Sequence, residues 1–517
     1  MQARRRRRAG RWCCEPSLGT PRAATGTGVA SARSMHIALI SLLLPQYNDS
    51  IAFMAIWAPS IEQRPGTRAS ALVEAMAEDI AAGRLQPGDR LPPQRDLAYA
   101  LGLSSNTVMR AYAEAAKRGY VVGEVGRGTY VRRPVDLSAG LPGAGLARPC
   151  DEGPIDFSLN LPFIGGASGA LSQTLAAIAG AGGLASYLDH QDGQSRSRHQ
   201  VAGATWVSRL GVKANDENVI LTNGAQQGIF ASLLAMLRPG DTLLTEELTY
   251  PPVKAMVRRL GARMRPVAID AEGLVPEALD AACRASGART VYCTPTLHTP
   301  TTATMSEARR RQIAAVAETH GLTLVEDDVF GLLPPERPQA LAALAPDRTI
   351  LVTSVSKSVA PGLRIGYVLA PEALVPGIRA AVSLSSWMPP PLMAEIASRW
   401  IGDGTALELN NRQRLHAARR QAMAQELLAG CEFSADPHGL HLWLRLPDRW
   451  SQDAFAAAAE RVGVLLQPSS VFAATSRGPA AVRLCLSHEA SDERVARGLA
   501  VVMDLLEKAE RDDELVV

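Results

Sequence analysis

A lysine set among small hydroxyl side chains is the feature of this sequence with the clearest chemistry. Lys357 lies between Ser354, Ser356 and Ser358, and a Pro-Gly turn and Arg364 follow. A lysine amine can form a Schiff base with an aldehyde, and hydroxyl groups and a guanidinium can hold a phosphate dianion. The stretch therefore fits an aldehyde cofactor that carries a phosphate. For the lysine taken alone, the alternative is a surface lysine in a serine-rich loop.

Regular strands and helices must position this lysine. The apolar, β-branched run Thr349–Thr353 precedes it directly and predicts a buried parallel strand. Ligands of open α/β sheets lie just beyond the carboxyl ends of such strands. From Ile155 to about Glu507 apolar strands alternate with helical stretches, which is typical of a βαβ domain.

Other segments of this domain carry groups that fit the same chemistry. Gly224, Ala225 and Gln226 put backbone N–H groups at the start of a predicted helix, which favours a phosphate. Six segments form a longer pattern: LTNGAQQ at 221–227, ELTYP at 247–251, VYCTPTLHTPT at 291–301, LTLVEDDVF at 322–330, TSVSKSVAPGLRIG at 353–366 and AVRLCL at 481–486. This pattern resembles the fold-type I pyridoxal 5'-phosphate (PLP) enzymes of the aspartate aminotransferase group over about two thirds of the chain.

The resemblance implies an α/β main domain with a mostly parallel sheet and helices on both faces. It implies that Lys357 binds the PLP aldehyde, that Asp327 pairs with the pyridine nitrogen, and that Tyr250 stacks on the ring. Arg483 matches the arginine that grips a substrate α-carboxylate. The remaining cofactor-binding residues implied are Gly224, Ala225, Gln226, Ser354, Ser356, Arg364 and Thr299.

Two positions depart from the family pattern. Thr299 stands where the family has an asparagine, and Phe330 stands where it has a tyrosine. Both family side chains hydrogen-bond the phenolic oxygen of the cofactor. We therefore expect this domain to bind the cofactor but to turn over substrates poorly.

The part of the chain before residue 135 predicts a different module. Leu72, Val73, Met76 and Ile80 repeat at helical spacing, and Gly83 can end that helix. A second helix is predicted over Gln94–Leu101, a third over Ser105–Arg118 with Ser104 as its N-cap, and two short strands over 121–122 and 129–131. Three helices followed by a two-stranded wing are typical of a winged-helix DNA reader.

Residues 83–131 also resemble the GntR family. The pattern G-x-L-x-P-G-x-x-L-P-x-x-R-x-L-A, then T-V-x-x-A-Y, then G-x-G-T-[FY]-V is met at every fixed position. The family often has an arginine where this chain has Ser105, which removes one charged contact. The residues implied to contact DNA are Arg95, Ser105, Asn106, Thr107, Arg110 and Arg127.

Charge is unevenly distributed along the 517 residues. Of the formal net charge of +3, residues 1–53 contribute +6 and residues 54–134 contribute +3, so the rest of the chain carries −6. Positive charge at the front suits a polyanionic partner there. We expect residues 1–53 to form a disordered basic tail, 54–134 the DNA-binding domain, 135–153 a Pro- and Gly-rich linker, and 154–517 the PLP-binding domain.

Cysteine spacing and hydropathy exclude several classes of protein. The seven cysteines show no C-x-x-C spacing, which indicates reduced thiols of the cytoplasm and predicts neither a disulfide framework nor a metal site. No apolar run reaches the roughly 18–20 residues of a membrane span.

A GntR-type winged helix joined to an aminotransferase-like domain is the layout of the MocR subfamily of bacterial transcription regulators. The resemblance implies a cytoplasmic homodimer that binds operator DNA and senses a small amine or amino acid through PLP. The alternatives are an active aminotransferase that carries a DNA-binding module, and a DNA-binding protein whose second domain serves only to dimerise.

Overall fold

A computed structural model of the chain describes residues 57–61, 66–86, 88–118, 120–124, 128–131, 153–190, 193–475 and 478–513. The chain divides into two compact units, residues 1–134 and 135–517. The predicted basic tail, Arg127 and all of the predicted linker except Gly153 lie outside the described residues.

The N-terminal unit has the predicted winged-helix architecture. Its elements are α1 (Arg68–Ala81), α2 (Gln94–Ala100), α3 (Ser105–Lys117), β1 (Val121–Glu124) and β2 (Gly128–Val131). The side chains of Thr67 and Ser104 cap α1 and α3, since each accepts a hydrogen bond from a backbone N–H of the first helical turn. The two strands pair antiparallel to form the wing.

One small hydrophobic core holds the three helices and the wing together. Leu72, Met76, Val108 and Ala111 are fully buried in it. The buried hydroxyl of Tyr112 donates a hydrogen bond of 2.8 Å to the carbonyl of Pro92, which ties α3 to the start of α2. Leu72, Val73 and Met76, which repeat at helical spacing in the first helix, are therefore core residues of this unit, and Ile80 packs against the core while partly exposed.

The main domain is built on a seven-stranded sheet of order β4-β12-β11-β10-β9-β5-β6. All neighbouring strands are parallel except β12, which pairs antiparallel with both β11 and β4. The strands are β4 (Val219–Thr222), β5 (Thr242–Glu246), β6 (Arg263–Val267), β9 (Thr290–Cys293), β10 (Thr323–Asp327), β11 (Thr349–Ser354) and β12 (Gly366–Leu369).

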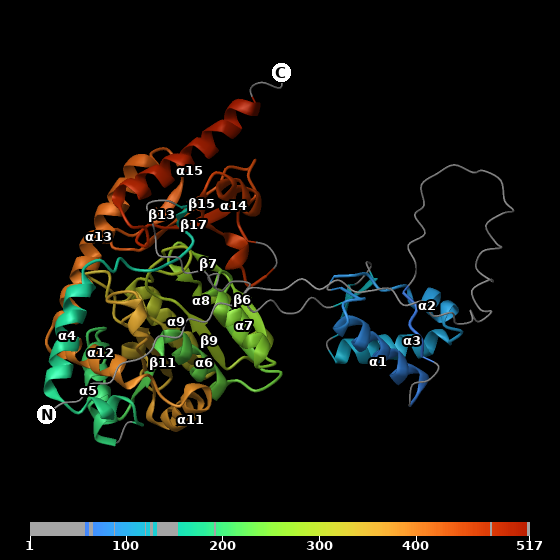
Figure 1. Ribbon diagram of the computed structural model, residues 1–517, viewed down its shortest axis with the longest axis horizontal. Coiled ribbons are helices and arrows are strands. Elements are labelled where there is room, and N and C mark those ends of the chain that lie inside the picture. The colour runs from blue at the N-terminus through green and yellow to red at the C-terminus, as the bar shows by residue number, and fades with distance from the viewer. Residues whose placement is uncertain are drawn as a thin grey trace, which may run out of the picture. The chain divides into compact units, whose positions relative to one another are not determined.

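Helices cover both faces of this sheet, which confirms the predicted fold class (Figure 1). One face packs against α6 (Gly224–Met236), α7 (Pro251–Arg259) and α11 (Val375–Ser386). The other face packs against α5 (Gly193–Ser208), α8 (Pro276–Ser286), α9 (Glu307–His320), α10 (Leu341–Leu344) and α12 (Pro391–Gly402). The helix α4 (Ala167–Ala181) and five short elements complete this part of the chain: η1 (Leu184–Tyr187), β7 (Ile269–Asp270), β8 (Gly273–Leu274), η2 (Pro361–Leu363) and η3 (Glu372–Leu374).

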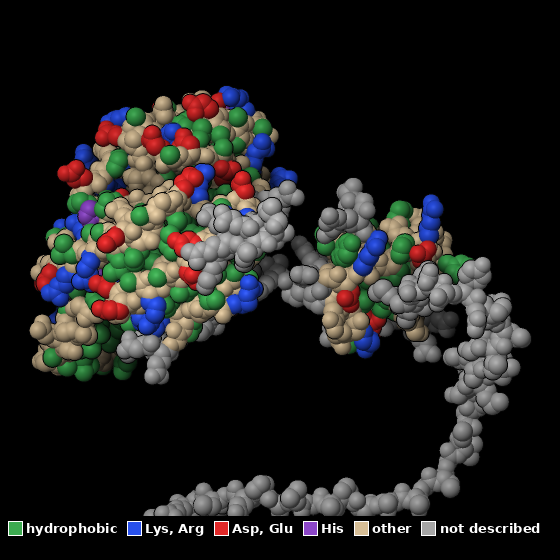
Figure 2. Space-filling view, turned by 90° about the horizontal axis from the view of Figure 1, so that it is seen from above, with side chains coloured by type: hydrophobic (Ala, Val, Ile, Leu, Met, Phe, Trp, Pro, Cys, Tyr) green, Lys and Arg blue, Asp and Glu red, His purple; other side chains and the backbone are tan. Residues whose placement is uncertain are grey.

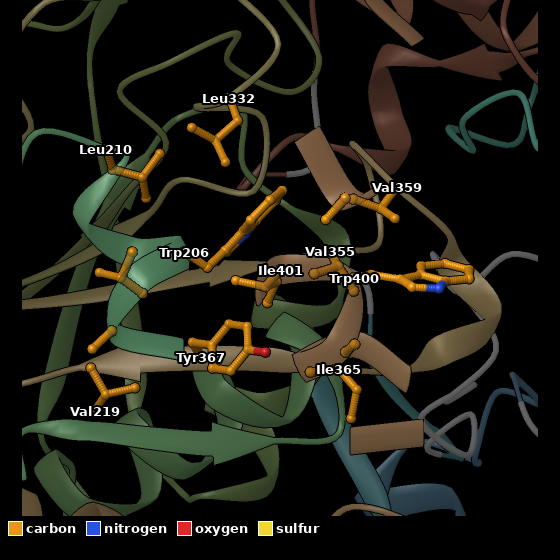
Figure 3. Close-up of a cluster of buried hydrophobic side chains, with 14 of the residues drawn as sticks. Trp206, Leu210, Val219, Leu332, Val355, Val359, Ile365, Tyr367, Trp400 and Ile401 are labelled. Atoms are coloured by element: carbon orange, nitrogen blue, oxygen red, sulfur yellow. The ribbon is translucent and has the colours of Figure 1, made fainter. Parts of the chain in front are cut away.

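The loop that carries Lys357 is anchored in the core. Val355 and Val359 flank the lysine and pack among Trp206, Trp400 and other buried side chains of α5 and α12 (Figure 3). Because apolar neighbours on both sides hold the backbone in place, the lysine between them is directed to the carboxyl end of β11.

A smaller sheet of order β13-β14-β17-β16 forms the C-terminal part of the main domain. Its core includes residues of three helices and of β3, the first strand of the domain, which pairs with β15. The elements are β3 (Ile155–Asp156), α13 (Thr405–Leu427), β13 (Phe433–Ala435), β14 (His441–Arg445), α14 (Gln452–Arg461), β15 (Val464–Leu465), β16 (Gln467–Pro468), η4 (Ser469–Val471), β17 (Ala481–Cys485) and α15 (Asp492–Asp513). No helix within the described ranges has the length and apolar character needed to cross a membrane.

Candidate functional site

A cavity opens at the carboxyl ends of β9, β10 and β11, beside the N-terminus of α6. Its volume is about 130 Å³. It brings together nine of the ten cofactor residues predicted from the sequence, together with Arg483. The residues that line it are Asn160, Leu161, Ala225, Gln226, Ile229, Tyr250, Thr294, Thr299, Asp327, Val329, Phe330, Ser354, Ser356, Lys357, Pro361, Arg364 and Arg483. The tenth, Gly224, is the first residue of α6 and directly precedes Ala225.

Lys357 is held in the cavity as an amine of unusually low basicity. Burial, and next the positive charge of Arg483, lower its pKa from 10.5 to about 8. Its ammonium group donates a hydrogen bond to the carbonyl of Asn160 and lies 5.8 Å from the centre of the Phe330 ring. At pH 7 a lysine of this pKa is neutral, and so nucleophilic, in about a tenth of the molecules.

Asp327 ends β10 and faces the same cavity. Burial raises its pKa to about 6, although the hydroxyl of Tyr292 on the neighbouring strand donates a hydrogen bond of 2.6 Å to its Oδ2. Its other oxygen, Oδ1, is buried and has no hydrogen-bond partner among the described residues. A buried carboxylate oxygen without a donor is a ready acceptor for a protonated ring nitrogen.

The backbone at the start of α6 leaves a small space beside Gly224, which the side chain of any other residue would fill. Gly224 has a φ of +74°, and a Cβ added there would lie 2.8 Å from the Arg364 guanidinium. Arg364 donates a hydrogen bond of 3.3 Å to the carbonyl of Asn223, just before the helix. The hydroxyl of Ser356 is buried with no partner among the described residues. These donors and the helix N-terminus suit a phosphate.

The other predicted residues close the cavity. Tyr250 precedes α7, and burial raises its pKa to about 12. Thr299 is buried in the loop after β9, and Ser354, the last residue of β11, accepts a hydrogen bond of 3.2 Å from the Ser356 amide. Phe330 presents a ring to the cavity where a tyrosine would present a hydroxyl.

Arg483 reaches the cavity from the smaller sheet. Its Nη2 donates a hydrogen bond of 2.7 Å to the carbonyl of Ser158, and its guanidinium lies 4.8 Å from the Phe472 ring. Its Nε is buried and has no partner among the described residues. The unpaired donor leaves Arg483 able to bind a carboxylate.

Three residues of the site escaped the sequence analysis. Tyr292 lies in an apolar strand whose sequence is typical of a hydrophobic core. The sequence around it gave no sign that its hydroxyl donates a hydrogen bond to Asp327. Asn160 and His441 contact each other, with 3.2 Å between Asn160 Nδ2 and His441 Nδ1. In the sequence LNLPF at 159–163, Asn160 is a polar residue between two leucines, and this was the one feature that could have pointed to it.

The predicted DNA-binding residues lie on the N-terminal unit. Arg95 of α2 and Ser105, Asn106 and Arg110 of α3 are exposed, and Thr107 is half-buried and contacts the capping Ser104. The first turn of α3 therefore presents polar side chains to solvent, as a recognition helix does. Arg127 is not among the described residues.

Two family descriptions match this chain. Residues 168–500 match "Aminotransferase class I and II", and residues 68–131 match "Bacterial regulatory proteins, gntR family". The two matches cover the main domain and the winged-helix unit described above.

Curated relatives share both parts. The uncharacterized HTH-type transcriptional regulator YdeF of Bacillus subtilis is 29% identical over 87% of this chain and 97% of its own. The HTH-type transcriptional regulator TauR of Rhodobacter capsulatus is 28% identical over 81% of this chain and 93% of its own. The vitamin B6 salvage pathway transcriptional repressor PtsJ of Salmonella typhimurium is 28% identical over 79% of this chain and 91% of its own.

Solved aminotransferases share the fold of the main domain. The α-aminoadipate aminotransferase LysN of Thermus thermophilus superposes with a TM-score of 0.64 at 21% identity, over 69% of this chain and 93% of its own. The match over residues 168–500 shows that the chain belongs to the aminotransferase class I and II family, and the gntR-type domain in front of it gives the two-domain layout expected of the MocR subfamily of transcription regulators.

Proposed function

We propose that this protein is a PLP-dependent transcription regulator of the bacterial cytoplasm whose main domain senses a small amine or amino acid. The observation that carries the proposal is the cavity that a partly buried lysine of lowered pKa shares with a buried carboxylate oxygen that has no partner among the described residues. The name of PtsJ, which refers to vitamin B6 salvage, supports PLP as the cofactor.

The polar atoms of the cavity fit PLP group by group. Asp327 Oδ1 and Ser356 Oγ are buried without partners among the described residues, and each finds one if the pyridine nitrogen and the phosphate bind there. Three cations, Lys357, Arg364 and Arg483, line the cavity against the single carboxylate of Asp327. This excess of positive charge suits a phosphate and a ligand carboxylate together.

When bound, PLP supplies an aldehyde that condenses reversibly with primary amines. Lys357 would hold that aldehyde, and Asp327 would keep a proton on the pyridine nitrogen. Tyr250 would pack against the ring, and the start of α6 with Arg364 would hold the phosphate. Arg483 binds a carboxylate of the incoming ligand, which selects amino acids over simple amines.

The winged-helix unit supplies the DNA contacts. Arg95 and Arg110 are exposed cations on α2 and α3, positioned to bind phosphates, and Asn106 can read a base edge. Figure 2 shows acidic and basic side chains interspersed over one face of the main domain. We therefore assign DNA binding to the N-terminal unit.

An exposed apolar patch near the cavity supports a homodimer. Leu188, Leu384 and Trp387 are 92%, 82% and 66% exposed. The two segments that carry them meet, since the ring of His190, two residues after Leu188, is 5.7 Å from that of Trp387. The same region reaches the site, since Ser386 accepts a hydrogen bond of 2.7 Å from Asn223, the residue before α6. Large exposed apolar side chains of this kind mark a protein interface, and a dimer carries two DNA heads for paired half-sites.

The experiment that tests the proposal combines cofactor trapping with DNA binding. Full-length protein is loaded with PLP, reduced with borohydride and mapped by mass spectrometry, with Lys357→Ala as the matched variant. Amino acids and simple amines are then titrated while the cofactor absorbance is followed, and the affinity for DNA from beside the gene is measured at several salt concentrations. We expect the PLP mass on Lys357 alone, and a ligand that changes both absorbance and DNA affinity. The absence of a mass on Lys357 refutes the proposal.

The second candidate is an active aminotransferase that carries a DNA-binding module. Phe330 argues against efficient turnover, because a ring replaces a hydroxyl beside the lysine. Turnover of an amino donor and a keto acceptor at rates typical of enzymes, about 1–1000 per second, without any ligand effect on DNA affinity, would favour this candidate.

A further inference from the structure

The segment 153–160 connects the site to the rest of the chain. It follows directly on residues 132–152, which lie outside the described residues and lead to the winged-helix unit. Four side chains with charged groups bind its backbone at both ends: Lys357, Arg483, Glu489 and Arg494.

At the end near the linker, a buried ion pair grips the segment. Arg494 Nε lies 2.5 Å from Glu489 Oε2, and the two side chains are 4% and 1% exposed. Arg494 Nη2 donates hydrogen bonds of 3.3 and 2.9 Å to the carbonyls of Gly153 and Pro154. Glu489 Oε1 accepts a hydrogen bond of 2.5 Å from the amide of Asp156. A pair so buried fixes the start of the main domain firmly.

At the other end, the two cations expected to bind the cofactor and the ligand donate hydrogen bonds to the backbone of the same segment. Arg483 donates to the carbonyl of Ser158, and Lys357 donates to the carbonyl of Asn160. The side chain of Asn160 in turn contacts His441 of β14. The occupancy of the site and the anchoring of this segment therefore share the same donors.

We propose that residues 153–160 form a strap that transmits the covalent state of Lys357 to the linker of the winged-helix unit. This rests on the proposed function and adds the route of regulation. Condensation joins the lysine nitrogen to the aldehyde carbon of PLP and releases the aldehyde oxygen as water. The nitrogen then keeps at most one hydrogen and is drawn to the cofactor, so its hydrogen bond to Asn160 is lost.

A ligand amine reverses this change. When its nitrogen replaces that of Lys357 on the same carbon, the lysine leaves as a free amine and can donate to the Asn160 carbonyl again. The hydrogen bond from Lys357 to the Asn160 carbonyl is thus present in the cofactor-free state, absent in the loaded state and present again after the ligand reacts. The other contacts of the strap remain throughout.

Hydrogen–deuterium exchange on the full-length protein tests the strap. Peptides that cover residues 153–163 are compared in four states: cofactor-free, PLP-loaded, PLP-loaded then treated with hydroxylamine, and PLP-loaded then reduced with borohydride before hydroxylamine. Hydroxylamine removes the aldehyde from any lysine, so the ligand need not be known, and reduction makes the bond to lysine permanent.

We expect exchange near residues 158–161 to be about fivefold faster in the loaded and the reduced states than in the cofactor-free state, because a segment that has lost one ordinary hydrogen bond to its Asn160 carbonyl opens more often and exposes its amides. Hydroxylamine should restore slow exchange only in the unreduced protein. Equal exchange in all four states, with the PLP mass on Lys357, overturns the strap alone. If no mass appears on Lys357, the proposed function fails as well.

A variant at the far end of the strap tests the transmission. Glu489→Gln keeps an oxygen for the Asp156 amide but removes the charge opposite Arg494. We expect it to load PLP and react with hydroxylamine as the wild type does, while the change in DNA affinity on hydroxylamine treatment falls several-fold. Glu408→Gln, which removes an exposed ion pair with Arg412 on α13, is the matched control and keeps the full response. A full response in Glu489→Gln overturns the transmission.

Discussion

The partly buried Lys357 should lower the stability of the cofactor-free protein, by an amount that follows from its pKa. Burial lowers the pKa of Lys357 from 10.5 to about 8. A change of one pKa unit corresponds to about 1.4 kcal/mol, so charging this lysine in the folded state costs roughly 3 kcal/mol below pH 8. Replacing Lys357 with methionine removes the cost together with the covalent chemistry.

The sign of the pH dependence is fixed by the same shift. Between about pH 8 and 10.5 the folded state binds fewer protons at this site than the unfolded state, so the stability of the wild type rises with pH across that window. Lys357→Met lacks this rise. We therefore compare the free energy of unfolding of Lys357→Met with that of the wild type at two pH values. The difference should favour the variant by roughly 3 kcal/mol more at pH 7 than at pH 10.5.

Thermal unfolding of the full-length, cofactor-free protein at both pH values measures the effect. For a domain of this size, 3 kcal/mol corresponds to a difference in Tm of roughly 4 °C. Lys213→Met is the control, because Lys213 is exposed and its charge stays solvated when the protein folds. If Lys357→Met and the wild type change Tm equally between pH 7 and 10.5, the pKa of Lys357 is not lowered in the folded protein.

Three further substitutions probe the two sites. Tyr292→Phe removes the hydrogen bond that lowers the pKa of Asp327. Absorbance titration at pH 7.5 should therefore show that the affinity for PLP is reduced about tenfold. The control is Tyr367→Phe, which should leave the affinity unchanged because the Tyr367 hydroxyl is buried and has no partner among the described residues. Arg483→Lys replaces a two-pronged donor with a single ammonium, and should weaken binding of amino acids about tenfold but not of amines that lack a carboxylate; equal losses would show that Arg483 does not read the carboxylate. Arg110→Ala should lower the salt slope of DNA binding by about 1, and an unchanged slope would place this arginine away from the phosphates.

Several helices and strands, and most of the candidate residues, could be predicted from short stretches of the sequence. Ser104 capped its helix as predicted, and Thr349–Thr353 formed the strand that ends next to Lys357. These features are local, because a cap, a turn and an apolar period depend on residues within a few positions of one another. The family resemblance supplied roles for single residues, such as Asp327 at the end of its strand.

How these residues pair depends on contacts between distant parts of the chain, which short stretches of sequence do not show. The partners Tyr292 and Asp327 are 35 positions apart, Lys357 and Asn160 are 197 apart, and Arg483 and Ser158 are 325 apart. In a buried strand both faces are apolar, so spacing cannot show which side chain meets the cavity. That depends on the order of β9, β10 and β11 in the sheet and on where the smaller sheet packs, and neither is encoded in a short stretch of chain.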